Sequence, residues 1–414
     1  MRFIHTADWH LGQKFYDHDR VEEHQHFLNW LKEAIRENRV ELLLIAGDVF
    51  DVANPSSEAQ TMFYRFLAAV ALENPHLEVI VAAGNHDSAS RLEAPADLLR
   101  SLNIRVTGNV RKTALGEIDY DSLIQPVYAG EAQVKAYCLS VPYLRPGDYP
   151  AVDEENGYMA GIALFYQRLF DRVMEISQGK HPVIAMGHLH ASNATLSDSE
   201  RSIRGGLEVV SAESFNEQLA YTALGHIHKA QRVGGSEKIR YSGSPLPMSF
   251  SEVNYNHQVV LVDVETGCET TIQKLEIPRL IDLKRIGTPD KPLTKDEVFL
   301  ALNHLPDRDK AQGYAPYIEV NVYLEEPEPL IQNEILEILR DKHVRFCRSQ
   351  SFYPQAKDAS TDEPITLDQV REVTPADMLE KVFMRRYGSD VPADLLDLFN
   401  DVVLKIYSDE DTCD

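Results

Sequence analysis

The first 87 residues alternate between short apolar runs and longer stretches whose apolar positions have helical spacing. Apolar runs at 2–6, 42–46 and 79–83 predict strands, and the run at 42–46 has no polar interruption, which is typical of a strand buried on both faces. Helical spacing predicts one helix over about 19–37 and a second that opens near Pro55. Strands that alternate with amphipathic helices predict right-handed βαβ units in a mainly parallel sheet.

Beyond residue 105 the apolar runs become shorter and turn-forming residues more frequent. This pattern predicts a second sheet packed on the first, with a helix near 162–176. The strands expected after residue 105 are 137–141, 183–186, 221–224, 239–241 and 259–262. We expect residues 1–275 to form the first domain.

A different pattern follows the first domain. Thr294 and Glu297 are spaced as a capping box before an apolar helical stripe, and residues 317–324 alternate cleanly between apolar and polar. A second helical stripe begins at Ile331, and a short apolar run near 344 ends the pattern. We therefore expect a small α/β capping domain over 276–352, with one sheet face exposed or covered by helices.

The C-terminal part of the chain lacks a further sheet pattern. Residues 353–373 show little periodicity and are interpreted as a linker, and 374–406 predict a helix hairpin that opens at Thr374-Pro375. Residues 407–414 form an acidic tail. Such a hairpin usually packs against its own chain, but its position after a linker favours docking on another protein.

Composition limits the classes of function. A chain of 414 residues with 43% hydrophobic and 26% charged residues is typical of a globular protein of two or three domains. No apolar run is long enough for a signal peptide or a membrane span, and the four cysteines are far apart, so we expect a cytoplasmic protein without a thiolate zinc site. The chain has no G-x-x-x-x-G-K-[ST] motif, so any ATP dependence requires a partner.

The net charge of −24 argues against a protein that coats nucleic acid by bulk electrostatics. Residues 351–414 hold 6 Lys and Arg against 15 Asp and Glu, which contributes much of this excess. A nuclease remains compatible with the charge, because bound metal ions can supply the local positive charge that meets a phosphate.

Five polar clusters each follow an apolar run. They are Asp8-x-His10, Gly47-Asp48-x-x-Asp51, Gly84-Asn85-His86-Asp87, Gly187-His188 and Gly225-His226-x-His228. Carboxylate, imidazole and amide ligands suit Mn²⁺, Fe²⁺ or Zn²⁺, and their number exceeds what one ion needs. Two ions that share one carboxylate, roughly 3.5–4 Å apart, would clamp a phosphate. Turn aspartates and core histidines would explain any one cluster alone, but not five in order.

The five clusters resemble the signature of the calcineurin-like metallophosphoesterases, whose fold is a double βαβαβ sandwich of two sheets between helices. The segments HTADWHLG, AGDVFD, AGNHDS, ALGHIHKAQ and YSGSPLPMSF are similar, more narrowly, to the SbcD family of bacterial nuclease subunits. The resemblance covers residues 1–252 by motif. It implies an α/β fold of this class with a small α/β cap domain and a C-terminal helix hairpin, which match that family in order and size.

The resemblance also implies two Mn²⁺ or other divalent cations per chain. The ligands of the first ion would be Asp8, His10, Asp48 and His228. The ligands of the second would be Asp48, Asn85, His188 and His226, so that Asp48 bridges the two ions. His86 matches the family's catalytic histidine, and the nucleophile would be a water bound to the metals.

Some assignments stay open on the sequence. His190 follows His188 as His228 follows His226, but the family pattern uses only the first histidine of that block. Asp51 could orient His86 or a ligand, or could simply cap a helix. Lys14, Arg20 and Lys229 could contact DNA phosphates or lie on a solvated surface.

By resemblance we expect a Mn²⁺-dependent DNA nuclease, active as a 3′-to-5′ double-strand exonuclease and as an endonuclease on single strands and hairpins. It would work with an SbcC-type coiled-coil ATPase in DNA end processing, repair, replication and recombination, as a homodimer within a heterotetramer. One rival is a phosphatase or cyclic-nucleotide phosphodiesterase of the same superfamily, against which the extra residues 276–414 argue. The other is a non-catalytic metal-binding scaffold, which would have no need of His86.

Overall fold

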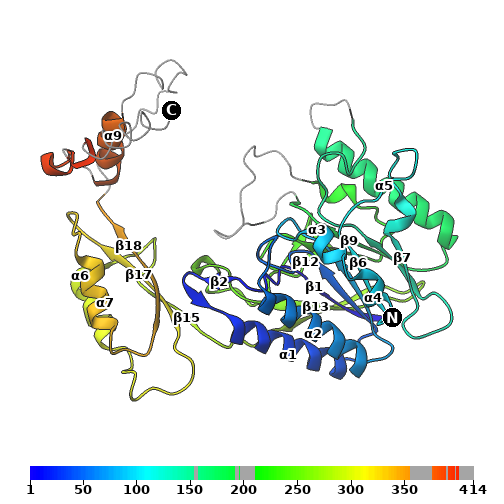
Figure 1. The fold of residues 1–414 in the computed structure, drawn as a ribbon, viewed down its shortest axis with the longest axis horizontal. Helices are drawn as coiled ribbons and strands as arrows, with labels where there is room; N and C mark the ends of the chain where they lie inside the picture. Colours follow the sequence, from blue (N-terminus) through cyan, green and yellow to red (C-terminus); the bar gives the residue numbers. More distant parts are fainter. Residues whose placement is uncertain are drawn as a thin grey trace, which may run out of the picture. The chain divides into compact units, whose positions relative to one another are not determined.

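The computed structural model describes residues 1–152, 157–191, 195, 210–354, 375–387, 390–396 and 398–400. The chain divides into two compact units, Met1–Ile281 and Asp282–Asp414 (Figure 1). Most of the predicted linker and the whole acidic tail lie outside the described residues. Within the described part of the chain, no helix has both the length and the apolar character needed to cross a membrane.

The first sheet of unit 1 has the strand order β14-β13-β1-β4-β5-β6. Its strands are β1 (Arg2–Thr6), β4 (Leu42–Ala46), β5 (Glu78–Ala82), β6 (Ile104–Thr107), β13 (Gln258–Asp263) and β14 (Thr271–Glu276). The first four run parallel, and β13 and β14 add an antiparallel edge. The parallel βαβ arrangement predicted for the first 87 residues is confirmed.

The second sheet has the strand order β11-β12-β10-β9-β8-β7. Its strands are β7 (Ile124–Val127), β8 (Ala136–Ser140), β9 (Val183–His188), β10 (Tyr221–Gly225), β11 (Gln231–Val233) and β12 (Ser236–Tyr241). The expectation that the run at 259–262 belongs here was wrong, because β13 pairs with β1 of the first sheet. An apolar run specifies a buried strand but not the sheet that it joins.

Helices cover the two outer faces of the paired sheets. They are α1 (Val21–Glu37), α2 (Ser57–Glu73), α3 (Ala89–Glu93), α4 (Ala96–Arg100) and α5 (Gly157–Ser177), and a small hairpin of β2 (Lys14–Phe15) and β3 (His18–Asp19) precedes α1. Helices α1 and α2 pack on the first sheet and α5 packs on the second (Figure 1). The predicted double sandwich of two sheets between helices is confirmed.

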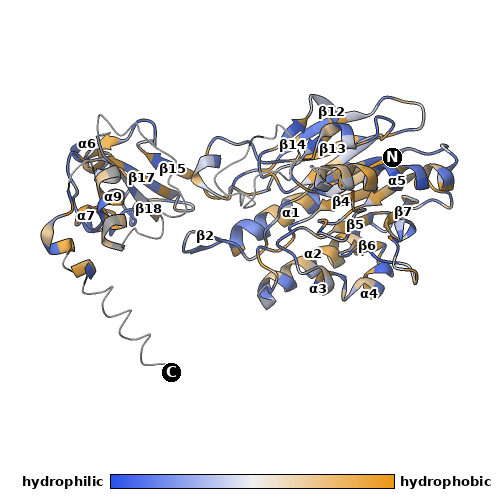
Figure 2. Cartoon of the chain, turned by 90° about the horizontal axis from the view of Figure 1, so that it is seen from above, coloured by the Kyte–Doolittle hydropathy of each residue, from blue (hydrophilic) through white to orange (hydrophobic). Residues whose placement is uncertain are grey.

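The strand β4 shows why the order of layers follows from the sequence. Its residues Leu43 and Ile45 point into the apolar cluster shared with α1 and α2, whereas Leu44 and Ala46 point into the cluster between the two sheets. All five residues of β4 are buried, as the uninterrupted apolar run predicts. The central strands β4 and β5 are accordingly largely hydrophobic in colour (Figure 2).

Unit 2 is built around a second, smaller sheet. Its elements are β15 (Leu283–Ile286), β16 (Leu293–Thr294), α6 (Lys295–Asn303), β17 (Tyr317–Tyr323), α7 (Ile331–Leu339) and β18 (Arg345–Phe352). The predicted capping box is confirmed, since Thr294 and Glu297 exchange both hydrogen bonds at the start of α6. Helices α6 and α7 cover the face of β17 that carries Ile318 and Val320.

The C-terminal hairpin is described in part. Its first helix, α9 (Pro375–Tyr387), begins at the predicted proline, and residues 393–396 and 398–400 are also helical. Residues 401–406 of the predicted second helix lie outside the described range. Tyr387 stacks on Phe383 and on Tyr353, which links α9 to the end of β18.

Candidate metal centre

The five polar clusters of the sequence meet at one edge of the sandwich. Asp8, Asp48 and Asn85 follow strands β1, β4 and β5 of the first sheet, and His188 and His226 end or follow β9 and β10 of the second. Ligand sites of open α/β sheets form where strands end in this way. The two sheets therefore contribute ligands from opposite sides of one crevice.

The backbone at this edge is held in a conformation that L-residues rarely adopt. Asp8, His10, Asp48 and His226 all have positive φ angles, at 56°, 45°, 49° and 101°. Strain of this kind persists only where surrounding contacts impose it, and it is concentrated at functional sites. Here Asp8 N donates to Gly47 O and His10 N donates to Asp48 O, both at 3.0 Å, so the first two clusters hold each other in place.

Two glycines of the motifs are required for space. A Cβ atom on Gly47 would lie 2.1 Å from Nδ1 of His188, and one on Gly84 would lie 2.1 Å from Oδ1 of Asp48. Either contact is far too short for a side chain to be accepted without displacement of a candidate ligand. The glycines of the sequence pattern therefore allow close approach of backbone to the site.

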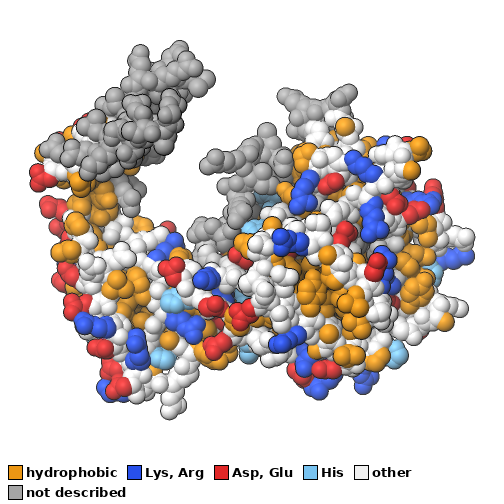
Figure 3. Space-filling model, viewed as in Figure 1, with side chains coloured by type: hydrophobic (Ala, Val, Ile, Leu, Met, Phe, Trp, Pro, Cys, Tyr) orange, Lys and Arg blue, Asp and Glu red, His pale blue; other side chains and the backbone are white. Residues whose placement is uncertain are grey.

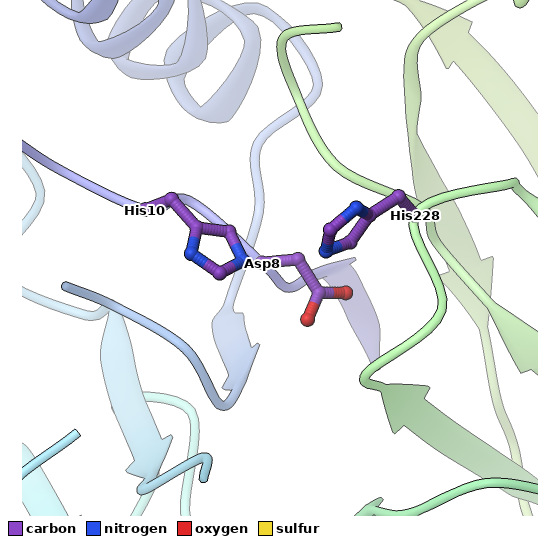
Figure 4. A group of neighbouring side chains, drawn as sticks. All are labelled: Asp8, His10 and His228. Atoms are coloured by element: carbon purple, nitrogen blue, oxygen red, sulfur yellow. The ribbon is translucent and has the colours of Figure 1, made fainter. Parts of the chain in front are cut away.

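Asp8, His10 and His228 form the first group of candidate ligands. One ligand atom from each lies within 4.8 Å of the others, and the Asp8 side chain lies between the two imidazoles (Figure 4). Oδ2 of Asp8 and both ring nitrogens of His10 are buried and form no hydrogen bond with any described residue. Buried polar atoms are rarely left in this state, so these atoms fit a bound cation.

The second group contains Asn85, His188 and His226. Oδ1 of Asn85 lies 3.0 Å from Nε2 of His188 and 3.0 Å from Nδ1 of His226. Nδ1 of His188 lies 2.9 Å from the Ala46 carbonyl oxygen and can only donate to it, so Nε2 is the nitrogen that would bind a cation once its proton is lost. That nitrogen is the one that faces Asn85 and Asp48.

Asp48 lies between the two groups. Its Oδ2 is 3.3 Å from Nε2 of His188 in the second group and 3.7 Å from Nε2 of His10 in the first. Its Oδ1 accepts the backbone N–H of His86 at 2.8 Å, which fixes the rotation of the carboxylate. One carboxylate thus faces ligands of both groups.

The buried acidic and basic groups of the site strongly shift one another's pKa values. Burial disfavours protonation of His188, yet the neighbouring Asp48 carboxylate reverses this and raises the pKa of His188 to about 9. Burial, together with the charge of His188, lowers the pKa of His226 to about 3. Burial alone would raise the pKa of Asp48, but the charge of His188 and its contact with the carboxylate lower that pKa below its usual range. The buried carboxylate therefore stabilises positive charge beside it.

His86 and Asp51 are linked through the main chain. Nδ1 of His86 donates to the carbonyl oxygen of Asp51 at 2.7 Å, so Asp51 orients the imidazole by its backbone. The Asp51 carboxylate lies 3.3 Å from Nδ1 of His10. The helix-cap interpretation of Asp51 is wrong, because Ser56 caps α2. His10, Asp51 and His86 also form a third possible metal group, which shares His10 with the first.

Three residues that support the site were given no role on the sequence, although Asp87 belongs to the third polar cluster. Trp9 is buried among Phe27, Phe63 and Phe66 and anchors the backbone between Asp8 and His10. Asp87 accepts N–H groups of Val49, Phe50 and Gly84, which ties the second cluster to the third; burial, with the Asp48 charge, raises its pKa to about 6. Glu252 is fully buried, 3.8 Å from Nδ1 of His228. Only Asp87 had a sequence signal, since it directly follows His86.

The proposed DNA contacts differ in exposure. The prediction that Arg20 contacts DNA was wrong, because Arg20 is only 1% exposed. Its guanidinium donates hydrogen bonds to the Glu23 carboxylate and to the Pro247 carbonyl oxygen. Lys14 is exposed, and Lys229 is half-buried with its ammonium group 5.3 Å above the Tyr255 ring. The His190 ring lies 6.4 Å from that of His226, and His190 belongs to none of the candidate metal groups among the described residues.

Comparison with known families gives the class of the fold and site. The calcineurin-like phosphoesterase family matches residues 1–230. The chain belongs to this family. Residues 279–387 match a second family, described as the type 5 capsule protein repressor C-terminal domain. Because the first match spans every candidate ligand, the chain is a metal-dependent phosphodiesterase.

Curated relatives narrow the family further. The SbcD subunit of nuclease SbcCD from Rhodobacter capsulatus is 38% identical over 77% of this chain and 80% of its own length. The protein of the same name from Escherichia coli strain K12 is 31% identical over 93% and 92%, and that from Bacillus subtilis strain 168 is 28% identical over 95% of each. The chain is thus an SbcD family member. A solved dimetal phosphatase from Danio rerio is 12% identical with a TM-score of 0.41 over 67% of this chain and 97% of its own.

Proposed function

We propose that this chain is the nuclease subunit of a complex with an SbcC-type ATPase and that it hydrolyses DNA phosphodiesters with two Mn²⁺ ions. The observation that carries the proposal is the position of Asp48, whose Oδ2 faces His10 of one candidate group and His188 of the other. A carboxylate shared in this way is what a pair of divalent cations requires. The relatives' name, which describes a nuclease, supplies the substrate class.

The donor set fits the proposed cations. Asp8, His10, Asp48 and His228 would hold one ion, and Asp48, Asn85, His188 and His226 the other. Nitrogen and oxygen donors without thiolate suit Mn²⁺, as they also suit Fe²⁺ and Zn²⁺. Bound there, the two cations would supply a nucleophilic water at neutral pH and neutralise charge on the phosphate. Within the described residues, the buried atoms of Asp8 and His10 that form no hydrogen bond support this assignment.

His86 is the proposed acid or charge-stabilising group. Its Nδ1 is engaged by the Asp51 carbonyl oxygen and its backbone N–H by Asp48. These two contacts fix the ring and point the Nδ1 proton at the carbonyl oxygen, so that Nε2 would donate to a leaving oxygen from the imidazolium form, in which both ring nitrogens carry protons. The proposed role of His86 is therefore proton donation to the leaving group, without metal ligation.

The C-terminal hairpin is the proposed docking segment for the ATPase. Apolar side chains that would normally be buried are exposed on its described part, namely Met378, Val382, Met384, Leu395 and Leu398. Phe383 is instead buried, so the hairpin has an inner and an outer side. Exposed apolar side chains gathered on one short segment mark a surface that a partner covers. The expected homodimer within a heterotetramer, the cytoplasmic location and the roles in repair, replication and recombination stay part of this proposal.

The deciding experiment compares two substrates with the full chain, with and without the ATPase, in Mn²⁺. The first substrate is DNA, supplied both as linear duplex and as single strands, and the second is the small phosphodiester bis(p-nitrophenyl) phosphate. We expect cleavage of both, and loss of DNA cleavage in His86→Ala with metal content unchanged by elemental analysis. Ester hydrolysis without any DNA cleavage would instead support a phosphatase or cyclic-nucleotide phosphodiesterase. Inertness toward both would support a scaffold.

The docking proposal has its own test. Leu398→Glu with Val382→Glu should abolish co-purification with the ATPase, because two charges would be buried in the interface. Leu300→Glu on α6, which is also an exposed leucine, is the matched control. Unchanged co-purification of the double variant would exclude this docking segment.

A further inference from the structure

The segment that follows β8 places an aromatic and a cationic side chain beside the candidate metal centre. Tyr143 is half-exposed, and its ring lies 6.2 Å from the His188 ring at an interplanar angle of 77°. Its backbone N–H donates to the Ala83 carbonyl oxygen at 2.8 Å, immediately before the Gly84-Asn85-His86 cluster. Tyr143 therefore lies at the edge of the site on the side of the second ligand group.

Arg145 stands next to this ring. Its guanidinium lies 5.6 Å from the centroid of Tyr143, within the range of a cation–π contact. Arg145 is exposed, and among the described residues it has no carboxylate partner. Some other surface arginines are neutralised, for example Arg172 by Asp121 and Glu175. In a chain of net charge −24, an arginine that has no carboxylate partner among the described residues and lies on Tyr143 is suited to bind an anion.

The backbone that carries the pair is held by its own turn. The Arg145 N–H donates to the Asp148 carboxylate and the Asp148 N–H donates back to the Arg145 carbonyl oxygen, both at 2.9 Å. Leu144, between the two side chains, is buried in the apolar cluster under α5. Pro142 and Pro146 fix the backbone on either side. Tyr143 and Arg145 are thus presented by a rigid segment.

We propose that Tyr143 and Arg145 bind the nucleotide next to the scissile phosphate, Tyr143 by stacking on its base and Arg145 by contact with its phosphate. The inference rests on the proposed nuclease function and adds a substrate-binding element to it. Aromatic rings with nearby arginines bind single-stranded nucleic acid in this way, because every base has a face to stack and every nucleotide a phosphate. Tyr143 and Arg145 would therefore favour unpaired, extended DNA over a small phosphodiester.

A structural role for Tyr143 makes a different prediction. If the ring served only to support His188 edge-on, its removal would disturb the ligand and impair every substrate equally. A role in substrate binding would impair only substrates that extend beyond the scissile phosphate. The two roles are therefore separated by substrate size.

The experiment measures kcat and KM in Mn²⁺ for a single-stranded oligonucleotide and for bis(p-nitrophenyl) phosphate. We expect Tyr143→Leu to raise KM for the oligonucleotide roughly tenfold, and Tyr143→Phe to retain most of the affinity. Arg145→Ala should lower the slope of log KM against log salt concentration by about 0.7, the value for one phosphate of a single strand. None of these three variants should change KM or kcat for the ester.

Two matched controls lie away from the site. Tyr128 is 37% exposed. It lies near the start of β8, the end away from Tyr143, because the preceding residue Val127 pairs with Ala136. Tyr128→Leu should therefore leave the kinetics on both substrates unchanged. Arg111 is an exposed arginine in the loop after β6, and Arg111→Ala should leave the salt slope unchanged.

Each outcome decides the matter. Oligonucleotide kinetics that are unchanged in Tyr143→Leu and Arg145→Ala, with an active wild type, would overturn this inference and leave the proposed function standing. Equal losses on both substrates would assign Tyr143 a structural role and also overturn it. A wild type that hydrolyses the ester but no DNA would remove the proposed function and this inference together.

Discussion

A buried carboxylate of unit 1 and one of unit 2 differ in how far the surrounding side chains satisfy them. In unit 2, Glu319 on β17 is fully buried, and its carboxylate accepts hydrogen bonds from Nε of Arg285 and Nε of Arg348, each at 2.6 Å. In unit 1, Asp8 is equally buried, yet its Oδ2 has no hydrogen-bond partner among the described residues. Glu319 is neutralised by two arginines, whereas Asp8 has, within the described part of the chain, only the His226 N–H and His188 at its Oδ1 and keeps Oδ2 for a group from outside.

The surroundings explain the difference. Glu319 lies on the face of β17 opposite to the one covered by α6 and α7, where strand pairing places Arg285 and Arg348 directly beside it. Asp8 is surrounded by histidines and a second carboxylate, and its ion-pair partner His188, 4.0 Å away, is shared with Asp48. Two buried carboxylates beside one cationic histidine are costly unless a metal supplies further compensation. On the visible face in Figure 3, by contrast, charges of both signs are interspersed in solvent.

The largest effect should follow from loss of the shared carboxylate. Asp48→Asn keeps the shape of the side chain but removes the charge that faces both groups, so hydrolysis of bis(p-nitrophenyl) phosphate in Mn²⁺ should fall by at least about a thousandfold. Bound metal, measured by elemental analysis after gel filtration, should fall with it. Asp121→Asn, a surface carboxylate paired with Arg172, is the control and should behave as wild type. An active Asp48→Asn would refute the two-cation site.

The next effect should be confined to unit 2. Glu319→Gln leaves two arginines around a neutral group, and we expect a loss of about 3 kcal/mol in the free energy of unfolding of that unit. Both tryptophans, Trp9 and Trp30, lie in unit 1. Urea unfolding followed by circular dichroism should therefore show an early transition that tryptophan fluorescence does not report.

A matched substitution and an activity measurement complete this test. Asp307→Asn removes an exposed carboxylate of the same unit, paired with Lys310 and Lys342, and should cause no measurable change. Ester hydrolysis should survive in Glu319→Gln, since its role is structural. If Glu319→Gln lost its metal-dependent ester hydrolysis, Glu319 would serve the metal centre, and the proposed difference between Glu319 and Asp8 would be wrong.

Metal should stabilise unit 1 selectively. A cation that binds only the folded state at a hundred times its Kd adds about 2.7 kcal/mol, so Mn²⁺ should raise the melting temperature reported by tryptophan fluorescence and a chelator should reverse the shift. In Asp8→Asn the buried charge is gone, so the metal-free protein should be at least as stable as wild type while the response to Mn²⁺ shrinks. A large destabilisation of metal-free Asp8→Asn would mean that His188 and the His226 N–H already compensate the charge of Asp8 without a metal.

The smallest effect should come from Glu252. Its carboxylate lies 3.8 Å from Nδ1 of His228 and accepts the Met248 N–H at 2.9 Å. Glu252→Gln retains the second contact but removes the charge, and carboxylates behind a ligating histidine typically affect metal affinity by 10–100-fold, so we expect about a tenfold weaker Mn²⁺ affinity by calorimetry. The melting temperature of the metal-free protein should not change. Unaltered affinity would show that Glu252 only holds the loop at Met248.

Much of the fold could be predicted because its signals are local. The strands at 2–6 and 42–46 and the capping box of Thr294 and Glu297 follow from period-two or period-3.6 patterns within a few residues. The candidate ligands could be found for the same reason, because each directly follows an apolar run. Parallel strands that end together bring such residues to one edge without any further information.

Other features depend on partners distant in the sequence. The apolar run at 259–262 predicts a strand, but its pairing with β1 depends on whether β1 has a free edge in the folded first sheet. Arg20 looks like a surface cation beside a motif, yet the Pro247 carbonyl oxygen, more than 200 residues away, helps to bury it. Glu252 and Tyr143 had no local pattern at all, since only their three-dimensional neighbours give them a role.

The sequence by itself determined which donor atoms the protein carries and the order of the strands that deliver them, because both depend on composition and short-range periodicity. Only the tertiary structure decided which atoms converge. It placed one oxygen of Asp48 between His10 and His188, satisfied Glu319 with arginines and left Oδ2 of Asp8 without a hydrogen-bond partner among the described residues. The physical reason is that a buried charge is stable only through its neighbours, and neighbours from separate strands and sheets exist only once the chain has folded.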